Sequence, residues 1–285
     1  MRRWKEKGVK VNTCVTSPPY FGLRNYLCDG QIGLEKTSDE YVQNLVEVFR
    51  CVRDVLSDNG TVWLNLGDSY AKRVSGDKKS LKPKNLIGIP WRVAFALQED
   101  GWYLRQDIIW HKANPMPESV TDRCTKAHEY VFLLSKSPKY YFDSAAIEEE
   151  AAYDGRKDEI MKGSTKYKDS EYTATTRQTI ATKGQPRWRK NEQGDRVRNK
   201  RSVWKISQKP YSGAHFATFP LQMVEPCILA GCPKEGVVLD PFMGSGTTAV
   251  VALNNNRKYL GCELNEEYRA LQKERIQDEV VLALK

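Results

Sequence analysis

The sequence is poor in metal-binding and disulfide patterns. It contains three histidines and seven cysteines, with no Cys-x-x-Cys pair. An odd number of scattered cysteines argues against both a disulfide framework and a structural zinc site. We therefore expect no bound metal and reduced thiols that mostly fill the core. The cysteines are Cys14, Cys28, Cys51, Cys124, Cys227, Cys232 and Cys262.

Long apolar runs are also missing. Val131 to Leu134 is among the longest, whereas a membrane-spanning helix needs roughly 20 apolar residues. The first residues do not show the basic, then apolar, then small-residue order of a secretion signal. The sequence therefore predicts a soluble, cytoplasmic protein without a membrane partner.

Aliphatic side chains are scarce between Ala151 and Ser202, where charged residues dominate. Ala151 to Lys205 contains 15 Lys or Arg against 7 Asp or Glu, which is most of the net charge of +9. A segment of this composition cannot bury a core of its own, so we expect it to be mobile unless a ligand orders it. Its positive charge predicts a polyanionic partner.

Outside this segment, apolar and polar stretches alternate as strands and helices do in an α/β protein. The pattern predicts a doubly wound, Rossmann-like sheet, mostly parallel, with helices on both faces. The predicted strands are Val11–Val15, Thr61–Leu66, Leu104–Trp110, Glu129–Ser135, Val237–Asp240 and Tyr259–Glu263, and ordered structure is expected to return at Ser202–Trp204. The predicted helices are Ser38–Val55 (N-cap Ser38, stop Asn59-Gly60), Ile89–Gln98, Leu221–Ala230, Thr247–Leu253 and one after Asn265.

A glycine loop follows the strand that ends at Asp240. Gly244 and Gly246 let the backbone approach a ligand, and the helix that begins there favours a negatively charged group. Glu263, 23 residues after Asp240, can accept hydrogen bonds from both hydroxyls of a ribose. Ala249 stands where a dinucleotide loop has its third glycine, which disfavours a nicotinamide or flavin cofactor. A carboxylate before the glycines suits the ammonium group of S-adenosylmethionine.

A rigid loop follows the first predicted strand. In Thr16-Ser17-Pro18-Pro19-Tyr20, two consecutive prolines forbid both a helix and strand pairing. The exocyclic amine of a nucleobase is a poor nucleophile, because its lone pair is delocalised into the ring. Two acceptors for the amine hydrogens, Ser17 Oγ and the Pro18 carbonyl, would draw that lone pair out, and the prolines fix the carbonyl direction. Tyr20 supplies an aromatic face for a base flipped out of a duplex.

With both loops in place, the chain resembles the exocyclic-amino DNA methyltransferases that use S-adenosylmethionine. Their permuted order has the catalytic loop first, the target-recognition region second and the glycine loop last. The resemblance therefore implies that residues 1–150 form the catalytic part, residues 151–202 a target-recognition insertion, and residues 203–285 the cofactor-binding part of one domain. Further matching blocks are Trp63–Asp68, Ile109–Lys112, Asn114–Pro117, His128–Tyr130 and His215–Pro220.

The resemblance also implies site residues. The segment from His215 is expected to close over the methionine end of the cofactor. The implied catalytic residues are Ser17, Pro18, Pro19 and Tyr20; the implied cofactor-binding residues are Asp240, Phe242, Gly244, Ser245, Gly246, Thr247, Thr248, Glu263, His215, Phe216, Thr218 and Phe219. Relatives usually begin with a further strand and a Gly-Asp segment that walls the adenine ring, and Met1 to Lys10 has neither. This departure predicts either a more open cofactor pocket or a chain that begins late and binds the cofactor weakly.

Double-stranded DNA is the substrate that the resemblance implies, in a bacterial, archaeal or viral setting. Basic residues interleaved with Trp188 favour phosphate and base contacts over a solvated loop. The expected DNA-binding residues are Arg187, Trp188, Arg189, Lys190, Arg196, Arg198, Lys200 and Arg201. Whether a cognate restriction endonuclease accompanies the chain, and whether it is a monomer or a homodimer, stays open.

In this family the Ser-Pro-Pro-Tyr loop is associated with N4 of cytosine, whereas Asp or Asn in place of Ser17 marks N6 of adenine. We therefore expect methylation of N4 on a flipped cytosine. Three alternatives stay open: N6 of adenine, an RNA or protein amide, and a non-catalytic DNA-binding protein with a degenerate cofactor site. Pro226-Cys227 resembles the nucleophile of ring-carbon methylation, but its apolar, helix-like context argues against that role.

Overall fold

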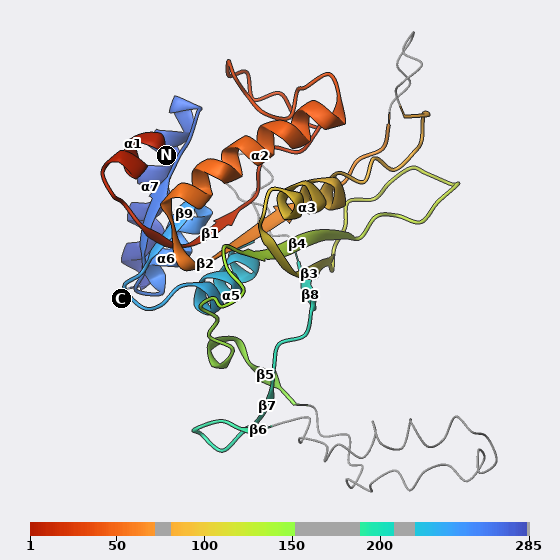
Figure 1. Cartoon of the computed structure of the whole chain (residues 1–285). Helices are drawn as coiled ribbons and strands as arrows, with labels where there is room; N and C mark the ends of the chain where they lie inside the picture. The colour runs from red at the N-terminus through yellow and green to blue at the C-terminus, as the bar shows by residue number, and fades with distance from the viewer. Residues whose placement is uncertain (72–80, 152–188, 208–219, 284–285) are drawn as a thin grey trace, which may run out of the picture. The chain divides into compact units, whose positions relative to one another are not determined.

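Figure 1 shows the computed structural model of the chain, which describes residues 1–71, 81–151, 189–207 and 220–283. The chain forms two compact units, residues 1–146 with 201–285, and residues 147–200. The sequence boundaries at 151 and 202 lie close to these limits.

A seven-stranded sheet forms the centre of the first unit, in the order β10-β9-β1-β2-β4-β3-β8. Among its strands, β4 alone runs antiparallel to its neighbours, so the predicted mostly parallel sheet is confirmed. The strands are β1 (Val11–Thr16), β2 (Leu56–Leu66), β3 (Tyr103–Lys112), β4 (His128–Ser135), β8 (Val203–Ile206), β9 (Val237–Asp240) and β10 (Lys258–Gly261).

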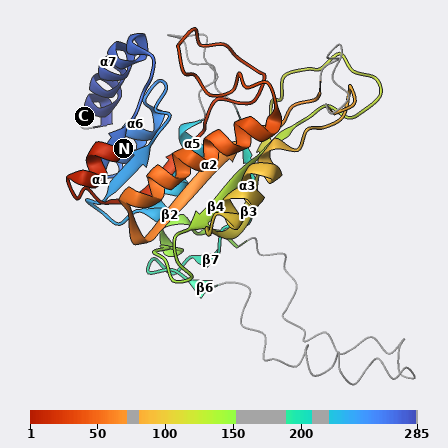
Figure 2. The same ribbon diagram turned by 45° about the horizontal axis from the view of Figure 1, so that its top comes forward.

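Helices cover both faces of the sheet, as predicted (Figures 1 and 2). On one face α2 contacts both α1 and α3, and on the other α6 contacts both α5 and α7. The sequence patterns predicted every one of these helices except α1. Their bounds are α1 (Arg2–Glu6), α2 (Ser38–Val55), α3 (Ile89–Glu99), α5 (Leu221–Gly231), α6 (Thr247–Asn254) and α7 (Glu266–Ala283).

The connections diverge between β1 and β9, which are neighbours and parallel. From β1 the chain passes through α2 to β2 on one side, and from β9 it passes through α6 to β10 on the other. Ligands of open α/β sheets bind outside the carboxyl ends of the strands at such a switch point. The two predicted loops, after β1 and after β9, therefore emerge side by side at this place.

The start and end of α2 differ from the predicted signals. Its N-cap is Thr37 rather than Ser38: the Thr37 side chain accepts from Glu40 N, and the Glu40 carboxylate accepts from Thr37 N. This reciprocal pair is a capping box, which stabilises a helix start. At the other end Leu56 is already extended, with φ −72° and ψ 137°, and begins β2. Asn59-Gly60, predicted to stop the helix, therefore lies inside β2.

Strand β10 ends at Gly261, earlier than the predicted Glu263. After Gly261 the chain leaves the ladder: Cys262 N donates to Asp240 O at 3.0 Å, and Cys262 O accepts from Met243 N at 2.9 Å. These bonds turn the chain toward the glycine loop. Glu263 is thus released from the sheet and can reach the backbone of that loop.

The second unit contains a small sheet that the composition did not predict. Its strands are β5 (Glu149–Glu150), β7 (Arg196–Arg198) and β6 (Arg189–Lys190), in that order. Val197 is buried, and Arg198 Nε donates to Glu149 Oε1 at 2.9 Å. One aliphatic side chain and paired charges thus order this part, whereas residues 152–188 of the predicted mobile segment lie outside the described residues.

The core of the first unit is apolar, and its largest fully buried side chains include Trp63, Trp110 and Phe49. All seven cysteines are free thiols, but only Cys14, Cys227 and Cys232 are buried, so the prediction that they mostly fill the core is wrong; Cys124 is exposed and the other three are half-buried. None of the helices in the described parts of the chain combines the length and apolar character needed to cross a membrane.

Candidate active site

A cavity of about 880 Å³ opens where β1 and β9 end. Its walls come from both predicted loops, from residues 23–32 after the first loop, from the ends of β2 and β3, from the start of β4 and from residues that follow β10. From the predicted sites it is lined by Ser17, Pro18, Pro19, Tyr20, Phe242, Gly244, Ser245, Thr247 and Glu263. A volume of this size suits a small-molecule ligand.

Side chains of α7 hydrogen-bond to the glycine loop and hold it in place. Gly244 and Gly246 have φ values of 51° and 85°, which favour glycine. Gln272 Nε2 donates to Gly244 O at 2.6 Å, and the buried Arg275 donates to Ser245 Oγ at 2.8 Å and Thr247 Oγ1 at 2.9 Å. The loop is therefore preorganised, and no sequence pattern predicted this role for α7.

Asp240 is the last residue of β9, just before this loop, and is 1% exposed. Its carboxylate accepts from Thr16 Oγ1 at 2.6 Å, from Thr248 Oγ1 at 2.7 Å and from Phe242 N at 3.0 Å. Burial raises the pKa of Asp240 to about 6, against the lowering effect of these hydrogen bonds. The carboxylate joins β1, β9 and α6, and it does not line the cavity.

Glu263 lines the cavity and is anchored at both oxygens. Its Oε2 accepts from Gly244 N at 2.7 Å, and its Oε1 accepts from Asn265 N at 2.9 Å. Each carboxylate oxygen accepts more than one hydrogen bond, so acceptor capacity is left for a ribose. Tyr26 and Tyr268 line the same end of the cavity, and burial raises the pKa of Tyr268 to about 12. A fixed carboxylate beside aromatic rings and an exposed loop backbone fits S-adenosylmethionine.

The Ser-Pro-Pro-Tyr loop also lines the cavity. Tyr41 Oη donates to Pro19 O at 2.8 Å, which ties the loop to α2. Ser17 Oγ donates to Asn65 Oδ1 at 3.1 Å, and Tyr20 Oη lies 2.9 Å from the same atom. Tyr20 packs so closely on Gly67 that no Cβ fits there. Ser17 and Tyr20 are thus held against the end of β2.

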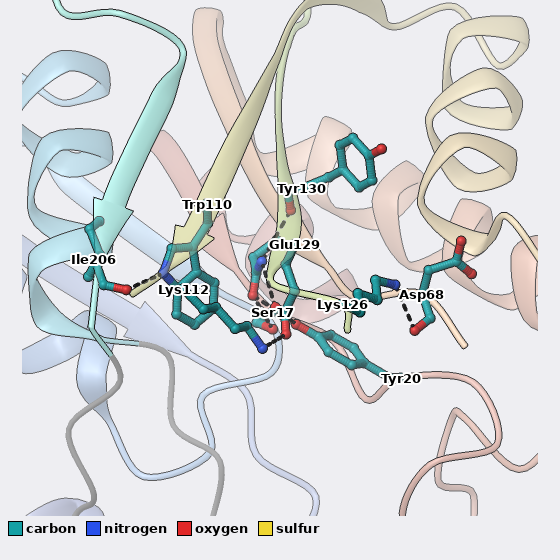
Figure 3. A network of polar contacts seen from close by, with 10 residues as sticks. Ser17, Tyr20, Asp68, Trp110, Lys112, Lys126, Glu129, Tyr130 and Ile206 are labelled. Carbon is teal, nitrogen blue, oxygen red and sulfur yellow. Dashed lines mark hydrogen bonds and ion pairs between the residues drawn. The ribbon is translucent and has the colours of Figure 1, made fainter. Parts of the chain in front are cut away.

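A polar network around Glu129 links Tyr20 to Lys112 of β3 (Figure 3). Glu129 Oε2 accepts from Tyr20 Oη at 2.5 Å and from Asn65 Nδ2 at 3.2 Å, and Glu129 Oε1 pairs with Lys112. Lys112 also lies 4.9 Å from the centre of the Trp110 ring. Burial, followed by the charge of Glu129, raises the pKa of Tyr20 well above its usual range, which keeps its phenol protonated.

The structure brings together all four predicted catalytic residues and five of the predicted cofactor residues. Asp240, Gly246 and Thr248 are buried and do not line the cavity. Predictions for His215, Phe216, Thr218 and Phe219 lie outside the described residues. Asn65, Lys112 and Glu129 belong to blocks that resemble the family, but the sequence alone predicted no role for them.

The predicted DNA-binding residues fall into three groups. Arg187 and Trp188 lie outside the described residues. In the second unit, Arg189 pairs with Glu148 and Arg198 with Glu149, while Lys190 and Arg196 are exposed on the hairpin. Lys200 is half-buried in this unit, and Arg201 is exposed in the first unit.

Cys227 does not fit the nucleophile of ring-carbon methylation. It lies inside α5, is 1% exposed and donates from Sγ to Met223 O. Among the described residues, no three His, Cys, Asp or Glu side chains are arranged to bind a metal ion.

Comparison with known proteins identifies the family. A family model described as DNA methylase matches residues 11–274. The Type II methyltransferase M.SmaI of Serratia marcescens is 47% identical over 280 residues, covering 92% of this chain and 82% of that protein. The Type II methyltransferase M.Cfr9I of Citrobacter freundii is 45% identical, covering 94% of this chain and 82% of that protein.

Solved structures share the fold. PvuII DNA methyltransferase, described as cytosine-N4-specific, superposes with a TM-score of 0.64 at 19% identity, covering 96% of this chain and 86% of that one. A putative DNA modification methylase of Thermus thermophilus, complexed with S-adenosyl-L-methionine, gives a TM-score of 0.59 at 22% identity, covering 97% and 91%. The chain belongs to the DNA methylase family, the N6 and N4 methyltransferases that depend on S-adenosylmethionine.

Proposed function

We propose that this chain methylates N4 of a flipped cytosine within a specific site of duplex DNA. The observation that carries the proposal is that the Ser-Pro-Pro-Tyr loop and the glycine loop line the same cavity. Ser17, rather than an acidic residue, is the first residue of the Ser-Pro-Pro-Tyr loop to line the cavity. The structural similarity to a methyltransferase described as cytosine-N4-specific supports this choice.

S-adenosylmethionine, when bound, supplies an electrophilic methyl group. Phe242, Gly244, Ser245 and Glu263 would hold it, with Glu263 accepting from the ribose hydroxyls. Ser17 Oγ and the Pro18 carbonyl would accept the two hydrogens of the base amine. These hydrogen bonds draw the amine lone pair out of the ring and orient it. Positioning of the reacting groups therefore supplies much of the reduction in the activation barrier.

Tyr20 would hold the base. Its hydroxyl donates its one proton to Glu129 Oε2 at 2.5 Å and lies 2.9 Å from Asn65 Oδ1, so the ring is fixed at the cavity wall and can lie against the face of a flipped cytosine. Its raised pKa keeps the hydroxyl a hydrogen-bond donor at neutral pH. Flipping the base costs a few kcal/mol of stacking and pairing, which contacts in the cavity must offset.

The relatives are named Type II methyltransferases. We infer from this that the chain modifies one DNA sequence and acts beside a restriction endonuclease. The basic hairpin of the second unit and the residues before it would supply phosphate and base contacts for site selection.

The test is to incubate the purified chain with unmethylated genomic DNA and labelled S-adenosylmethionine, and to identify the labelled nucleoside by mass spectrometry. N4-methylcytosine is the expected product. N6-methyladenine would overturn the cytosine assignment while leaving the amine chemistry in place. Absence of label on DNAs of several compositions would overturn the enzymatic proposal.

A further inference from the structure

Lys112 and Glu129 form a largely buried ion pair beside the catalytic loop, and the proposed reaction uses neither directly. Their side chains are 17% and 10% exposed, and they come from β3 and from the start of β4. Burying two charges is costly even when they are paired. A role at the cavity that both residues line would explain their presence.

Asn65 connects this pair to Ser17. Its amide nitrogen donates to Glu129 Oε2 at 3.2 Å and to Tyr130 O at 3.1 Å, which uses both N–H groups. Turning the amide over would point its oxygen at a carboxylate and a carbonyl, two groups that only accept. The carboxylate of Glu129 therefore fixes which end of Asn65 faces Ser17.

The end that faces Ser17 is the oxygen, which only accepts. The Ser17 hydroxyl can then direct its single proton to Asn65 Oδ1, 3.1 Å away. Both lone pairs of Ser17 Oγ are left for the cavity, where the proposed reaction needs an acceptor. With the opposite amide orientation, Ser17 would accept from Asn65 and point its own proton at the base amine. Two donors would then face each other, and no hydrogen bond to the amine could form.

We propose that Lys112 and Glu129 are positioning residues that set the direction of the Ser17 hydroxyl proton through Asn65. This inference rests on the proposed amine methylation and extends it. Lys112 carries only N–H donors, so it takes one oxygen of Glu129, and the other oxygen serves Asn65 and Tyr20 (Figure 3). As long as Lys112 is present, residue 129 needs two acceptor oxygens, one for Lys112 and one to hold the amide of Asn65.

This requirement defines a double-mutant test. In Glu129→Gln, the one oxygen of the new amide accepts from Lys112, so its NH₂ group faces the NH₂ group of Asn65. The Asn65 amide must then turn over to place its oxygen there. We expect kcat to fall about 100-fold, as for loss of one preorganised hydrogen bond at a reacting centre. Lys112→Met leaves both oxygens of Glu129 in place and is expected to lower kcat less than tenfold.

The double variant Lys112→Met with Glu129→Gln is decisive. Without Lys112, the glutamine oxygen can face Asn65, so kcat should recover at least tenfold relative to Glu129→Gln alone. The KM for DNA and the Kd for S-adenosylmethionine should stay within about threefold in all three variants. A purely structural ion pair would make the double variant no better than Glu129→Gln, and that result would overturn the proposal.

Two controls separate the outcomes. Glu118→Gln breaks another ion pair, Glu118 with Arg123 at 2.6 Å, outside the cavity, and should leave kcat within about twofold. Thermal unfolding of each variant shows whether it folds. If the wild-type chain methylates N6 of adenine, the cytosine assignment fails but the kcat pattern still decides the role of the pair. An inactive wild-type chain would overturn both proposals.

Discussion

Ser17 has one hydroxyl proton, and Asn65 Oδ1 is its acceptor at 3.1 Å. In Ser17→Ala the base amine loses one of its two proposed acceptors, while the glycine loop and Glu263 are untouched. We expect single-turnover methyl transfer to slow by about 100-fold or more, and the Kd for S-adenosylmethionine, measured by calorimetry, to change less than threefold. Ser137→Ala, beyond the end of β4, is the matched control. Loss of cofactor binding in Ser17→Ala would show that the loop is wrongly assigned.

Asp240 was predicted to pair with the ammonium of the cofactor, yet its carboxylate is enclosed by Thr16, Thr248 and Phe242 N. We expect Asp240→Asn, which keeps shape and most hydrogen bonds, to weaken S-adenosylmethionine binding less than about fivefold. Direct ion pairing would cost tenfold or more, because charge-assisted hydrogen bonds are about twice as strong as neutral ones. Calorimetric titration of this variant, with Thr248→Ser as a conservative companion, distinguishes the two roles.

The same residue predicts a pH dependence of stability. Burial raises the pKa of Asp240 to about 6, so the folded chain holds this proton more tightly than the unfolded chain. The resulting stabilisation is fully present below about pH 4 and is lost as the pH rises through about 6. A shift of this size corresponds to on the order of 3 kcal/mol. Urea unfolding of the wild type and Asp240→Asn should therefore diverge between pH 4 and pH 7, and parallel curves would contradict the shift.

At the scale of elements, the close approach of β2 to the catalytic loop is specific to glycine. A Cβ on Gly67 would collide with the Tyr20 ring. Gly67→Ala should therefore displace Tyr20 from Asn65 and Glu129, lower kcat/KM at least tenfold and cost about 1–3 kcal/mol of stability. In Gly8→Ala a Cβ meets nothing within 4 Å, but the φ of 66° strains alanine, so this variant is the control for a loss of stability outside the cavity and should leave kcat/KM unchanged. Unchanged kinetics in Gly67→Ala would mean that Tyr20 need not be fixed there.

Local patterns predicted most elements well, because their signals lie within the elements themselves. The apolar face of α2 and the apolar run of β9 are such signals. The start of β2 was missed because Asn59-Gly60 usually ends an element, whereas here Gly60 lies against Asn12 O and Leu56. That contact depends on the neighbouring strand β1. A single residue, Val197, was enough to give the hairpin of the second unit a buried side chain, and a composition average cannot show this.

At the scale of the whole chain, the candidate site was partly predictable. Both loops carry contiguous motifs, and the parallel neighbours β1 and β9 bring them together. Asn65, Lys112 and Glu129 come from three different strands, and their meeting depends on the order β1-β2-β4-β3. That order includes the antiparallel β4 inserted between β2 and β3, which no local pattern specifies. No local pattern predicted that Arg275 of α7 supports the glycine loop either, because the two residues in contact are 30 positions apart in the sequence.

The distribution of charge predicts how binding to DNA depends on salt. Lys190 and Arg196 are exposed on the hairpin within the basic segment that holds most of the net charge. If both contact phosphates, replacing both with Gln should reduce the slope of log Kobs against log salt by up to about 1.8, since each phosphate contact contributes roughly 0.9. Fluorescence anisotropy on a labelled duplex at several salt concentrations measures this slope. Lys234→Gln with Lys258→Gln removes the same charge near the amino ends of β9 and β10, away from the cavity edge of the sheet. An equal loss of slope in both pairs would show that net charge alone, rather than contact by the hairpin, attracts the DNA.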